Sequence, residues 1–278
     1  MALGRGQKCL RKRRGESEIM IQSSGTAERI RPWASGIVAA VCLAIFGLTA
    51  HAAEIQKPKA VVELFTSQGC NSCPPADRVL AELAKKGDVL ALAWHVDYWD
   101  YLGWKDTFGD PEHTKRQRAY AVSLGKRSVY TPQAIINGRT DVVGSRGAEV
   151  QQQIDAAAAS GGLSVPIKAS FEEGTLAVEI DASEESRNST LWIVYFNNGS
   201  DVPIKHGENG GQTLHYSNIV RDSEMIGMVK DEKLQTRFPL AEMGRRGYDS
   251  CALVLQKTSA EGTPGPIVGA AIIKNLKH

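Results

Sequence analysis

The sequence predicts an α/β fold in the first half of the chain and an all-β antiparallel sandwich in the second half. Residues 61–159 alternate short apolar runs with helical patterns, which is typical of parallel strands joined through helices. Residues 163–278 instead contain about seven short runs of alternating polarity with turn residues between them. Gly161-Gly162 lies at the change of pattern, so we expect domains at 54–160 and 163–278.

The first two strands and the first two helices are expected in alternation. "VVELFT" (61–66) and "VLALAWHV" (89–96) are continuous apolar runs, the pattern of strands that are buried on both faces. "PPADRVLAELAKKG" (74–87) and "DPEHTKRQRAYAVSLG" (110–125) are helical, because proline stands in the first turn of each and glycine at its end. Asp110 is the expected N-cap of the second helix.

A hairpin and a third helix complete the first domain. "QAIING" and "TDVVG" are short strands joined through Asn137-Gly138-Arg139, a sequence typical of hairpin turns. "SRGAEVQQQIDAAAA" (145–159) is helical, and Ser145 is its expected N-cap. The resulting order of strand, helix, strand, helix, strand, strand and helix describes a small three-layer α/β sandwich.

The first 53 residues have the composition of a secretory signal peptide. A basic stretch at Arg11 to Arg14 precedes an uncharged apolar run from Ser35 to Leu48, and Ala50-His51-Ala52 supplies the small residues of a cleavage site. The apolar run is shorter than the ~20 residues of a membrane span, so we expect cleavage and no stable membrane span afterwards. A start at Met20 would give a leader of ordinary length. The mature protein is therefore expected in the periplasm or outside the cell.

Charge and cysteine content narrow the function classes. The formal net charge of the whole chain is +2, and loss of the basic leader leaves a small negative charge, which gives no basis for a nucleic-acid partner. The cysteines that remain after cleavage are Cys70, Cys73 and Cys251. Because Cys251 lies in the apolar run "CALVLQ", we expect it to be a buried structural thiol rather than a third redox partner.

Cys70 and Cys73 form a Cys-x-x-Cys pair at the expected junction of the first strand with the first helix. A zinc site of this kind normally has a second ligand pair, and none follows in the sequence. Histidines stand singly along the mature chain, as at His95, His113, His206 and His215. A sulfur at a helix N-terminus is stabilised as a thiolate by free N–H groups and the helix dipole. We therefore expect a redox dithiol without metal or organic cofactor, in which Cys70 attacks and Cys73 resolves.

Four segments carry a resemblance to a known family: "VVELFTSQGCNSCPPAD", "HVDYWDYLGWKD", "RSVYTPQAIING" and, more weakly, "HGENGGQTLHYSNIVRD". They resemble the thioredoxin superfamily and, more narrowly, the secreted bacterial proteins of the domain-of-unknown-function family DUF1223. The resemblance covers nearly all of the mature chain and implies a thioredoxin-like βαβαββα domain at 54–160. The family has no settled activity, so the resemblance informs the fold more than the function.

The resemblance also implies roles for three residues near the dithiol. Pro132 in "YTPQAIING" stands where thioredoxin-like folds place a cis-proline facing the dithiol, and Thr131 matches the residue whose backbone pairs with a substrate polypeptide. Glu63 lies roughly where thioredoxins keep a buried carboxylate that accepts the proton of the resolving thiol. The alignment there differs by one residue, which on a strand exchanges the two faces, so a salt-bridged glutamate is the alternative.

Aromatic residues are dense in "AWHVDYWDYLGWKDTF" (93–108), at the sheet edge where the dithiol is expected. Tyr98 and Trp99 are candidates for an aromatic wall that positions a peptide substrate. The alternative is that the rings of this segment fill the seam between the two domains. The segment "NNGSDVPIKHGENGGQ" (197–212) is a further candidate to reach this edge, through Lys205, His206 or Glu208.

These observations together predict an exported thiol–disulfide oxidoreductase that acts on a thiol or disulfide of another exported protein or peptide. Two alternatives stay open. In the first, Cys70 and Cys73 form a static disulfide in a binding module, and replacing Cys70 by serine leaves function intact. In the second, the two thiolates and a histidine such as His95 or His206 handle copper, since soft thiolates suit Cu(I).

Overall fold

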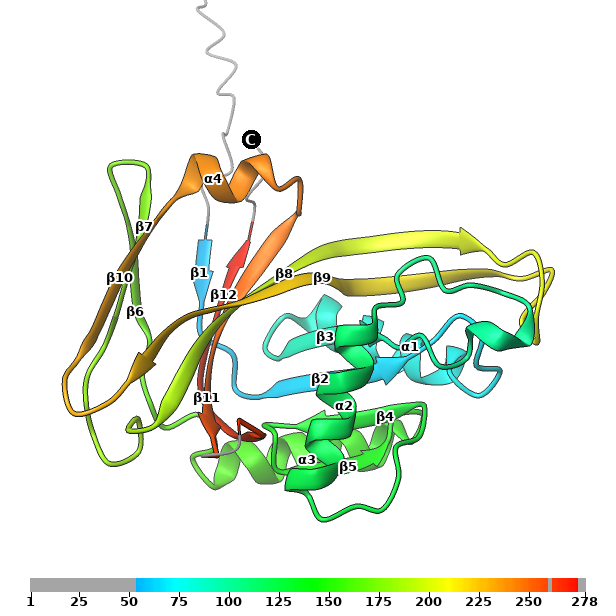
Figure 1. The fold of residues 1–278 in the computed structure, drawn as a ribbon, viewed down its shortest axis with the longest axis horizontal. Helices are drawn as coiled ribbons and strands as arrows, with labels where there is room; N and C mark the ends of the chain where they lie inside the picture. Colours follow the sequence, from blue (N-terminus) through cyan, green and yellow to red (C-terminus); the bar gives the residue numbers. More distant parts are fainter. Residues whose placement is uncertain (1–53, 260–261, 275–278) are drawn as a thin grey trace, which may run out of the picture. The chain divides into compact units, whose positions relative to one another are not determined.

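The structure is a computed structural model that describes residues 54–259 and 262–274. The predicted signal peptide, residues 1–53, lies outside the described residues. The strands of the first half are β1 (Glu54–Gln56), β2 (Val61–Thr66), β3 (Leu90–His95), β4 (Gln133–Ile136) and β5 (Thr140–Val143). The helices of this half (Figure 1) are α1 (Pro74–Lys86), the short 3-10 helix η1 (Asp100–Leu102), α2 (Pro111–Ser123) and α3 (Gly147–Ala159).

The sequence patterns of the first half produce the predicted elements. α1 ends at Gly87, whose φ of 75° closes the helix in the left-handed region. Asp110 caps α2 as predicted, by accepting a hydrogen bond of 2.8 Å from the backbone N–H of Glu112. Asn137 and Gly138 both have positive φ, as the tight turn between β4 and β5 requires.

The predicted cap of α3 is wrong. The N-cap residue is Arg146 rather than Ser145, and it makes no side-chain capping bond. The helix begins at Gly147, where an added side-chain carbon would lie 3.2 Å from Val79 Cγ2 on α1. The first residue of α3 therefore lies in close contact with α1, which no local sequence pattern indicates.

The second half of the described chain is built from strands and one short helix. The strands are β6 (Lys168–Glu172), β7 (Thr175–Ile180), β8 (Ser189–Pro203), β9 (Thr213–Val229), β10 (Leu234–Pro239), β11 (Ser250–Thr258) and β12 (Pro264–Lys274). The helix is α4 (Leu240–Arg245). These seven strands of the described residues agree with the prediction in number, but β8 and β9 have 15 and 17 residues and are not short. No helix in either half, as far as the structure describes them, is long and apolar enough to cross a membrane.

The strands form two sheets. Nine strands lie in the order β1-β12-β11-β8-β9-β3-β2-β4-β5, and β10-β7-β6 form a separate three-stranded sheet. Apolar side chains of β7, among them Leu176, Val178 and Ile180, pack against β8, β11 and β12. This contact gives the sandwich-like arrangement that the sequence predicts. Cys251 on β11 lies inside it as a buried free thiol, and burial raises the pKa of that thiol.

Strands of the second half continue the sheet of the first half. β9 lies beside β3 and pairs with it in parallel at Ile219 and Ala93, and β8 and then β11 follow in antiparallel pairing. β3 is buried on both faces and has β2 on its other edge, so β9 covers part of an edge that would otherwise leave backbone groups unpaired. The change of pattern at Gly161-Gly162 is therefore not a break between separate sheets, and the described residues belong to one compact unit.

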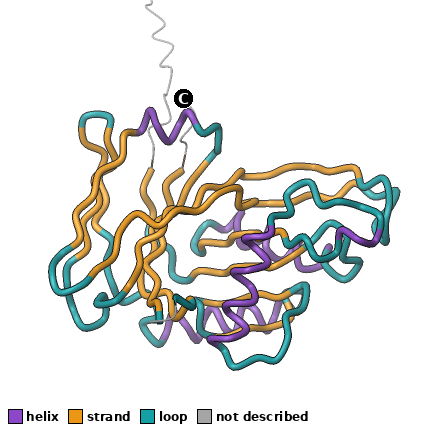
Figure 2. Tube along the Cα trace, viewed as in Figure 1, coloured by secondary structure: helices purple, strands orange, loops and turns teal. Residues whose placement is uncertain are grey.

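β2 is buried on both faces, and its side chains divide between two clusters on opposite sides of the sheet. Val62 and Leu64 pack in an apolar cluster with α1 and α3, whereas Phe65 packs in a cluster with α2. The three helices gather around this part of the sheet (Figure 2, purple), while strands dominate the rest of the described chain. Because successive side chains of a strand alternate between faces, Glu63 points to the α2 side and Thr66 to the α1 side.

Candidate functional site

Cys70 and Cys73 are joined by a disulfide between β2 and α1. Their Cα atoms are 5.4 Å apart, and Cys73 is the N-cap residue of α1. The backbone N–H of Asp77 donates to Cys73 O at 3.1 Å, which anchors the disulfide on the first turn of the helix. Both cysteines are buried, with exposed fractions of 1% and 0%, although the intervening residues Asn71 and Ser72 are exposed.

Two hydroxyl groups lie at the sulfur of Cys70. Thr131 Oγ1 donates to Cys70 Sγ at 3.3 Å, and Ser72 Oγ lies 3.4 Å from the same atom. Trp99 Nε1 donates to Thr131 Oγ1 at 2.8 Å, which leaves the hydroxyl proton of Thr131 directed to the sulfur. The Thr131–Pro132 peptide bond is cis, as the sequence resemblance implies. In the reduced state, hydrogen-bond donors in these positions would favour the Cys70 thiolate over the thiol.

Trp99 packs over the turn that leads to Cys70. A side-chain carbon added at Gly69 would lie 3.1 Å from Trp99 Cβ and 3.2 Å from Trp99 O, so the two segments are in close contact. The ring of Tyr98 lies 6.0 Å from that of Trp99, and burial raises the pKa of the Tyr98 hydroxyl. The structure therefore connects Trp99 to Cys70 through Thr131, and Tyr98 lies beside Trp99.

Replacing Trp99 by alanine is expected to increase the rate at which dithiothreitol reduces the disulfide by about tenfold, which corresponds to about 1.4 kcal/mol. The reason is that the substitution removes the ring that packs on the turn before Cys70 and the donor to Thr131, and access limits thiol–disulfide exchange. The measurement is the pseudo-first-order reduction rate at fixed pH. Tyr101→Ala is the control, since Tyr101 stacks on Trp99 but is 78% exposed, and its rate should equal that of the unmodified protein. An unchanged rate in Trp99→Ala would mean that Trp99 does not limit access.

Glu63 lies on the face of β2 that α2 covers, away from α1. Arg116 Nε donates to Glu63 Oε1 at 2.8 Å, and the hydroxyl of Tyr120 donates to Glu63 Oε2. Gln256 on β11 extends this buried network, because it accepts from Arg116 and donates to Tyr120. The structure thus places Glu63 in the salt-bridged position and not beside Cys73, because the alternation of β2 turns its side chain away from the helix that begins after Cys73.

A buried carboxylate on the α1 face is Asp77, one helical turn after Cys73. Thr66 Oγ1 donates to Asp77 Oδ1 at 2.8 Å, whereas Oδ2 has no hydrogen-bond partner among the described residues. Burial raises the pKa of Asp77 to about 7. The sequence contained a signal for this residue, since Asp77 follows Cys73 by four positions and therefore shares its face of the helix.

Asp77 belongs to a buried polar cluster on the α1 face. Thr66 and His95 are register partners on β2 and β3, and His95 Nδ1 lies 2.9 Å from Asp106 Oδ2 in a hydrogen bond. Burial acts to raise the pKa of Asp106, but His95 and backbone N–H donors outweigh it and hold that pKa below its ordinary value. The ring of Tyr216 lies 4.8 Å from that of His95. Within the part of the chain that is described, His95 Nε2 and the Tyr216 hydroxyl have no hydrogen-bond partner, so the cluster has unused polar atoms beside Asp77.

The connection between β8 and β9 reaches the dithiol through Asn209, which sequence reasoning missed. Asn209 Nδ2 donates to Gln68 O at 2.9 Å and to Cys70 O at 3.0 Å, and the residue is 2% exposed. The backbone N–H of Gln68 donates to Asp106 Oδ2 at 2.7 Å, so the turn before Cys70 is held from both sides. No hydrogen bond of the described residues joins the sulfurs to the predicted residues of this connection, which are Lys205, His206 and Glu208.

The other rings of the aromatic segment pack against the β8–β9 pair. Trp104 and Phe108 lie against an apolar cluster that includes Ile204 and Tyr216, and Trp104 Nε1 donates to Gln68 Oε1 at 2.8 Å. The interpretation that the rings fill the seam is confirmed for part of the segment, whereas a role in positioning a peptide stays a prediction. Trp99 lies at the dithiol, whereas Trp104 and Phe108 fill the contact between the two halves of the chain.

The two histidines named for copper lie in different surroundings. His95 Nδ1 is directed to Asp106, and the ring of His206 lies 6.5 Å from that of Trp104. Among residues 54–259 and 262–274, no group of three or more His, Cys, Asp or Glu side chains is placed to hold a metal ion. The copper alternative thus gains no supporting observation from these residues.

The fold and the site define a mixed α/β protein that carries a Cys-x-x-Cys disulfide at a strand–helix junction of a large sheet. The sequence profile described as "Protein of unknown function (DUF1223)" matches residues 61–256. The chain therefore belongs to the DUF1223 family, as its motifs predict.

Two solved structures resemble this chain. The crystal structure of protein AGR_C_4864 from Agrobacterium tumefaciens is 38% identical in sequence, with a TM-score of 0.70 over 79% of this chain and 95% of that chain. HBP35 of Porphyromonas gingivalis is 14% identical, with a TM-score of 0.54 over 77% of this chain and 74% of that chain, and this likeness concerns the fold alone. A comparison with curated proteins finds no match.

Proposed function

We propose that this protein is an exported thiol–disulfide oxidoreductase with a thioredoxin-like first half, acting on a thiol or disulfide of another exported protein or peptide. The observation that carries the proposal is the convergence of the Thr131 and Ser72 hydroxyls on Cys70 Sγ, in a disulfide at the start of α1. The element order β2-α1-β3-α2-β4-β5-α3 and the cis bond before Pro132 support the thioredoxin-like assignment. The predicted signal peptide supports export.

The proposed reaction passes two electrons between the dithiol and a substrate disulfide. In the reducing direction, the Cys70 thiolate attacks one substrate sulfur, a mixed disulfide forms, and the other substrate sulfur leaves as a thiolate that takes up a proton. Cys73 then loses its proton and attacks Cys70 Sγ, which forms the Cys70–Cys73 disulfide and releases the second substrate thiolate. The same steps in reverse oxidise a substrate dithiol.

The side chains around the disulfide fit separate steps of this reaction. Thr131 and Ser72 are placed to donate hydrogen bonds to the Cys70 thiolate, which stabilises it before attack and when it leaves. Asp77, with a pKa of about 7, is suited to take the proton of Cys73 near neutral pH, because a proton acceptor is most effective when its pKa lies near the working pH. Trp99 packs on the turn before Cys70 and orients the Thr131 hydroxyl.

One observation favours a second candidate, a binding module with a static disulfide. Both cysteines are almost fully buried, and structural disulfides of exported proteins typically lie in protected positions. In that case the reduction potential would lie below about −300 mV, the range of disulfides that resist reduction by cellular thiols.

Trapping with a Cys73→Ala variant distinguishes the two candidates. The oxidoreductase is expected to accumulate mixed disulfides through Cys70 in the compartment to which it is exported, since the resolving thiol is absent, and the bands should disappear on treatment with dithiothreitol. The Cys70→Ala/Cys73→Ala variant is the control, because it keeps only the buried Cys251 of the described cysteines. A redox titration of the purified protein should give a potential above about −300 mV. A lower potential together with no mixed disulfide would support the static disulfide instead.

A further inference from the structure

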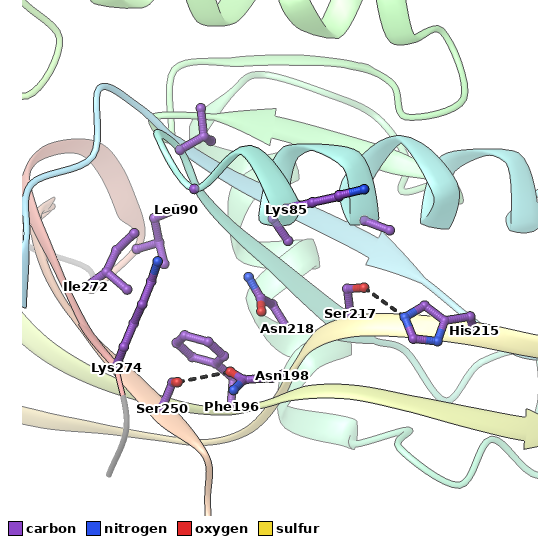
Figure 3. A pocket seen from close by; sticks show the side chains of 14 residues that line it. Lys85, Leu90, Phe196, Asn198, His215, Ser217, Asn218, Ser250, Ile272 and Lys274 are labelled. Atoms are coloured by element: carbon purple, nitrogen blue, oxygen red, sulfur yellow. Dashed lines mark hydrogen bonds between the residues drawn. The ribbon is translucent and has the colours of Figure 1, made fainter. Parts of the chain in front are cut away.

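A cavity of about 470 Å³ opens between α1 and strands β8, β9 and β12 (Figure 3). Its volume lies in the range of about 300–1,000 Å³ that small-molecule sites occupy. The residues that line it include neither cysteine nor any member of the Asp77 cluster. The cavity is thus a separate feature of the fold, and ligand binding there does not depend on the proposed redox activity.

The cavity exists because β9 diverges from β3. The two strands pair at one position only, Ala93 with Ile219. The preceding residue of β9, Asn218, has a φ of 46°, and its Nδ2 donates to Ala91 O at 2.8 Å in place of a backbone partner. A non-glycine residue in the left-handed region is uncommon inside a strand, and such positions cluster at ligand sites. The opening is therefore stabilised by a specific side chain rather than being a gap left by poor packing.

The polar part of the lining is cationic. It contains Lys85 and Lys274, no aspartate or glutamate, and the exposed His215. Neither lysine has an ion-pair partner among the described residues, whereas the imidazole of His215 is hydrogen-bonded to Asp201 and Ser217. A cavity lined in this way attracts an anion and repels a cation.

The remaining lining combines apolar side chains with amides and hydroxyls. Figure 3 shows Leu90 and Ile272 beside Lys274, with Phe196 below them and the amide of Asn218 between this group and Ser217. Ser250 donates to Asn198 Oδ1 at 2.9 Å, which leaves the amide hydrogens of Asn198 available to an acceptor. An apolar wall next to free ammonium and amide donors fits a molecule with an apolar body and one anionic group.

We propose that this cavity binds a small amphiphilic carboxylate, whose apolar body packs on Leu90, Phe196 and Ile272 and whose carboxylate pairs with Lys274, while Lys85 adds to the positive charge of the cavity. The competing explanation is that the lysines only complement the negative end of α1, since Lys85 lies in its last turn and Lys274 Nζ lies 3.6 Å from the position of a carbon added at Gly87. Lys86 is in the same last turn but does not line the cavity. Replacing Lys86 therefore tests the charge at the helix end without changing the cavity.

The test is an NMR titration of the full-length protein with octanoate, followed at the backbone amides of the cavity residues. Octanol and acetate are the comparison probes. Octanol has the apolar chain without the charge, and acetate has the charge without the apolar chain. We expect saturable shifts at the cavity with octanoate and at least tenfold weaker binding of either comparison probe. Lys85→Met/Lys274→Met should weaken octanoate binding by about tenfold, corresponding to about 1.4 kcal/mol, because it removes one partly exposed ion pair and a second positive charge of the lining. Lys86→Met should bind as the unmodified protein does.

A second variant tests where octanoate binds and removes no side chain of the core. Ala81 of α1 lines the cavity, so Ala81→Phe should fill it and abolish the octanoate shifts while the thermal midpoint stays unchanged. Three results would overturn the proposal: no saturable octanoate binding, equal affinity for octanoate and octanol, or a Lys86→Met effect as large as that of the double lysine variant. Octanoate binding that survives Ala81→Phe would also overturn it, because the ligand would then lie elsewhere.

Discussion

Asp77→Asn is expected to make the oxidised protein more stable above pH 7, by on the order of 4 kcal/mol. The folded pKa of Asp77 is raised to about 7 by burial, from an ordinary value of 3.8. Between these values the folded protein holds a proton that the unfolded chain releases, so the stability of the unmodified protein falls as the pH rises from about 4 to about 7. The asparagine variant has no charge to bury and should lack this fall. Urea unfolding at pH 5 and pH 8 measures the difference.

Asp88→Asn is the matched control for this experiment. Asp88 is exposed, and its pKa is lowered by a hydrogen bond and charge interaction with Lys59. The loss of an exposed ion pair changes stability by about 1 kcal/mol or less, so its effect should be small and of opposite sign. The Asp77 assignment would be contradicted if Asp77→Asn were less stable than the unmodified protein at pH 8. Asp77→Asn should also slow the step in which Cys73 releases a mixed disulfide near neutral pH, because the variant lacks the proton acceptor.

Arg116→Met is expected to destabilise the protein by about 3–5 kcal/mol at pH 7, because it leaves the Glu63 carboxylate buried without its cation. Glu63 and Tyr120 would lose the donors that now neutralise and orient them. The additional change Glu63→Gln should restore part of the lost stability by removing the uncompensated charge. Urea titration at pH 7 gives the free energy of unfolding of the unmodified protein, of Arg116→Met and of Arg116→Met/Glu63→Gln.

The Arg116 experiment has two controls, which are an exposed ion pair and the pH dependence of disulfide reduction. Arg146 forms an exposed ion pair with Glu149, so Arg146→Met should change the stability by about 1 kcal/mol or less. The pH dependence of disulfide reduction should be the same in Glu63→Gln as in the unmodified protein, because Glu63 lies on the α2 face. If Glu63→Gln shifted that pH profile and Asp77→Asn did not, the two carboxylates would have been assigned to the wrong roles.

The local elements could be predicted because their signals are local. Asp110 before Pro111 caps α2, Gly87 ends α1, and the Asn137-Gly138 turn joins β4 and β5, since each conformation depends on a few neighbouring residues. The joining of both halves into one sheet had no such signal. β9 meets β3 across more than a hundred residues of sequence, and hydrophobic periodicity indicates that a strand is buried without indicating which strand lies beside it.

The same distinction applies to the site. Cys70, Cys73 and the cis bond between Thr131 and Pro132 were accessible to motif reading, because each lies in a short characteristic segment. The carboxylate expected to accept the proton of Cys73 was harder to assign from the sequence, since a shift of one position on a strand exchanges the α2 face for the α1 face. Asn209 could not be found from its neighbours, because its polar loop looks like an ordinary surface connection and its two carbonyl partners lie 139 and 141 residues away.

The position of Asn209 has a consequence for how proteins of this architecture can diverge. The turn before the first cysteine belongs to one half of the chain, while the side chain that holds its carbonyls belongs to the other. Recombination that exchanged the second half between relatives would therefore also exchange a residue that fixes the geometry of the sulfur. The two halves are expected to evolve as a matched pair, and a segment cut at Gly161-Gly162 would lack a side chain that holds the turn before Cys70.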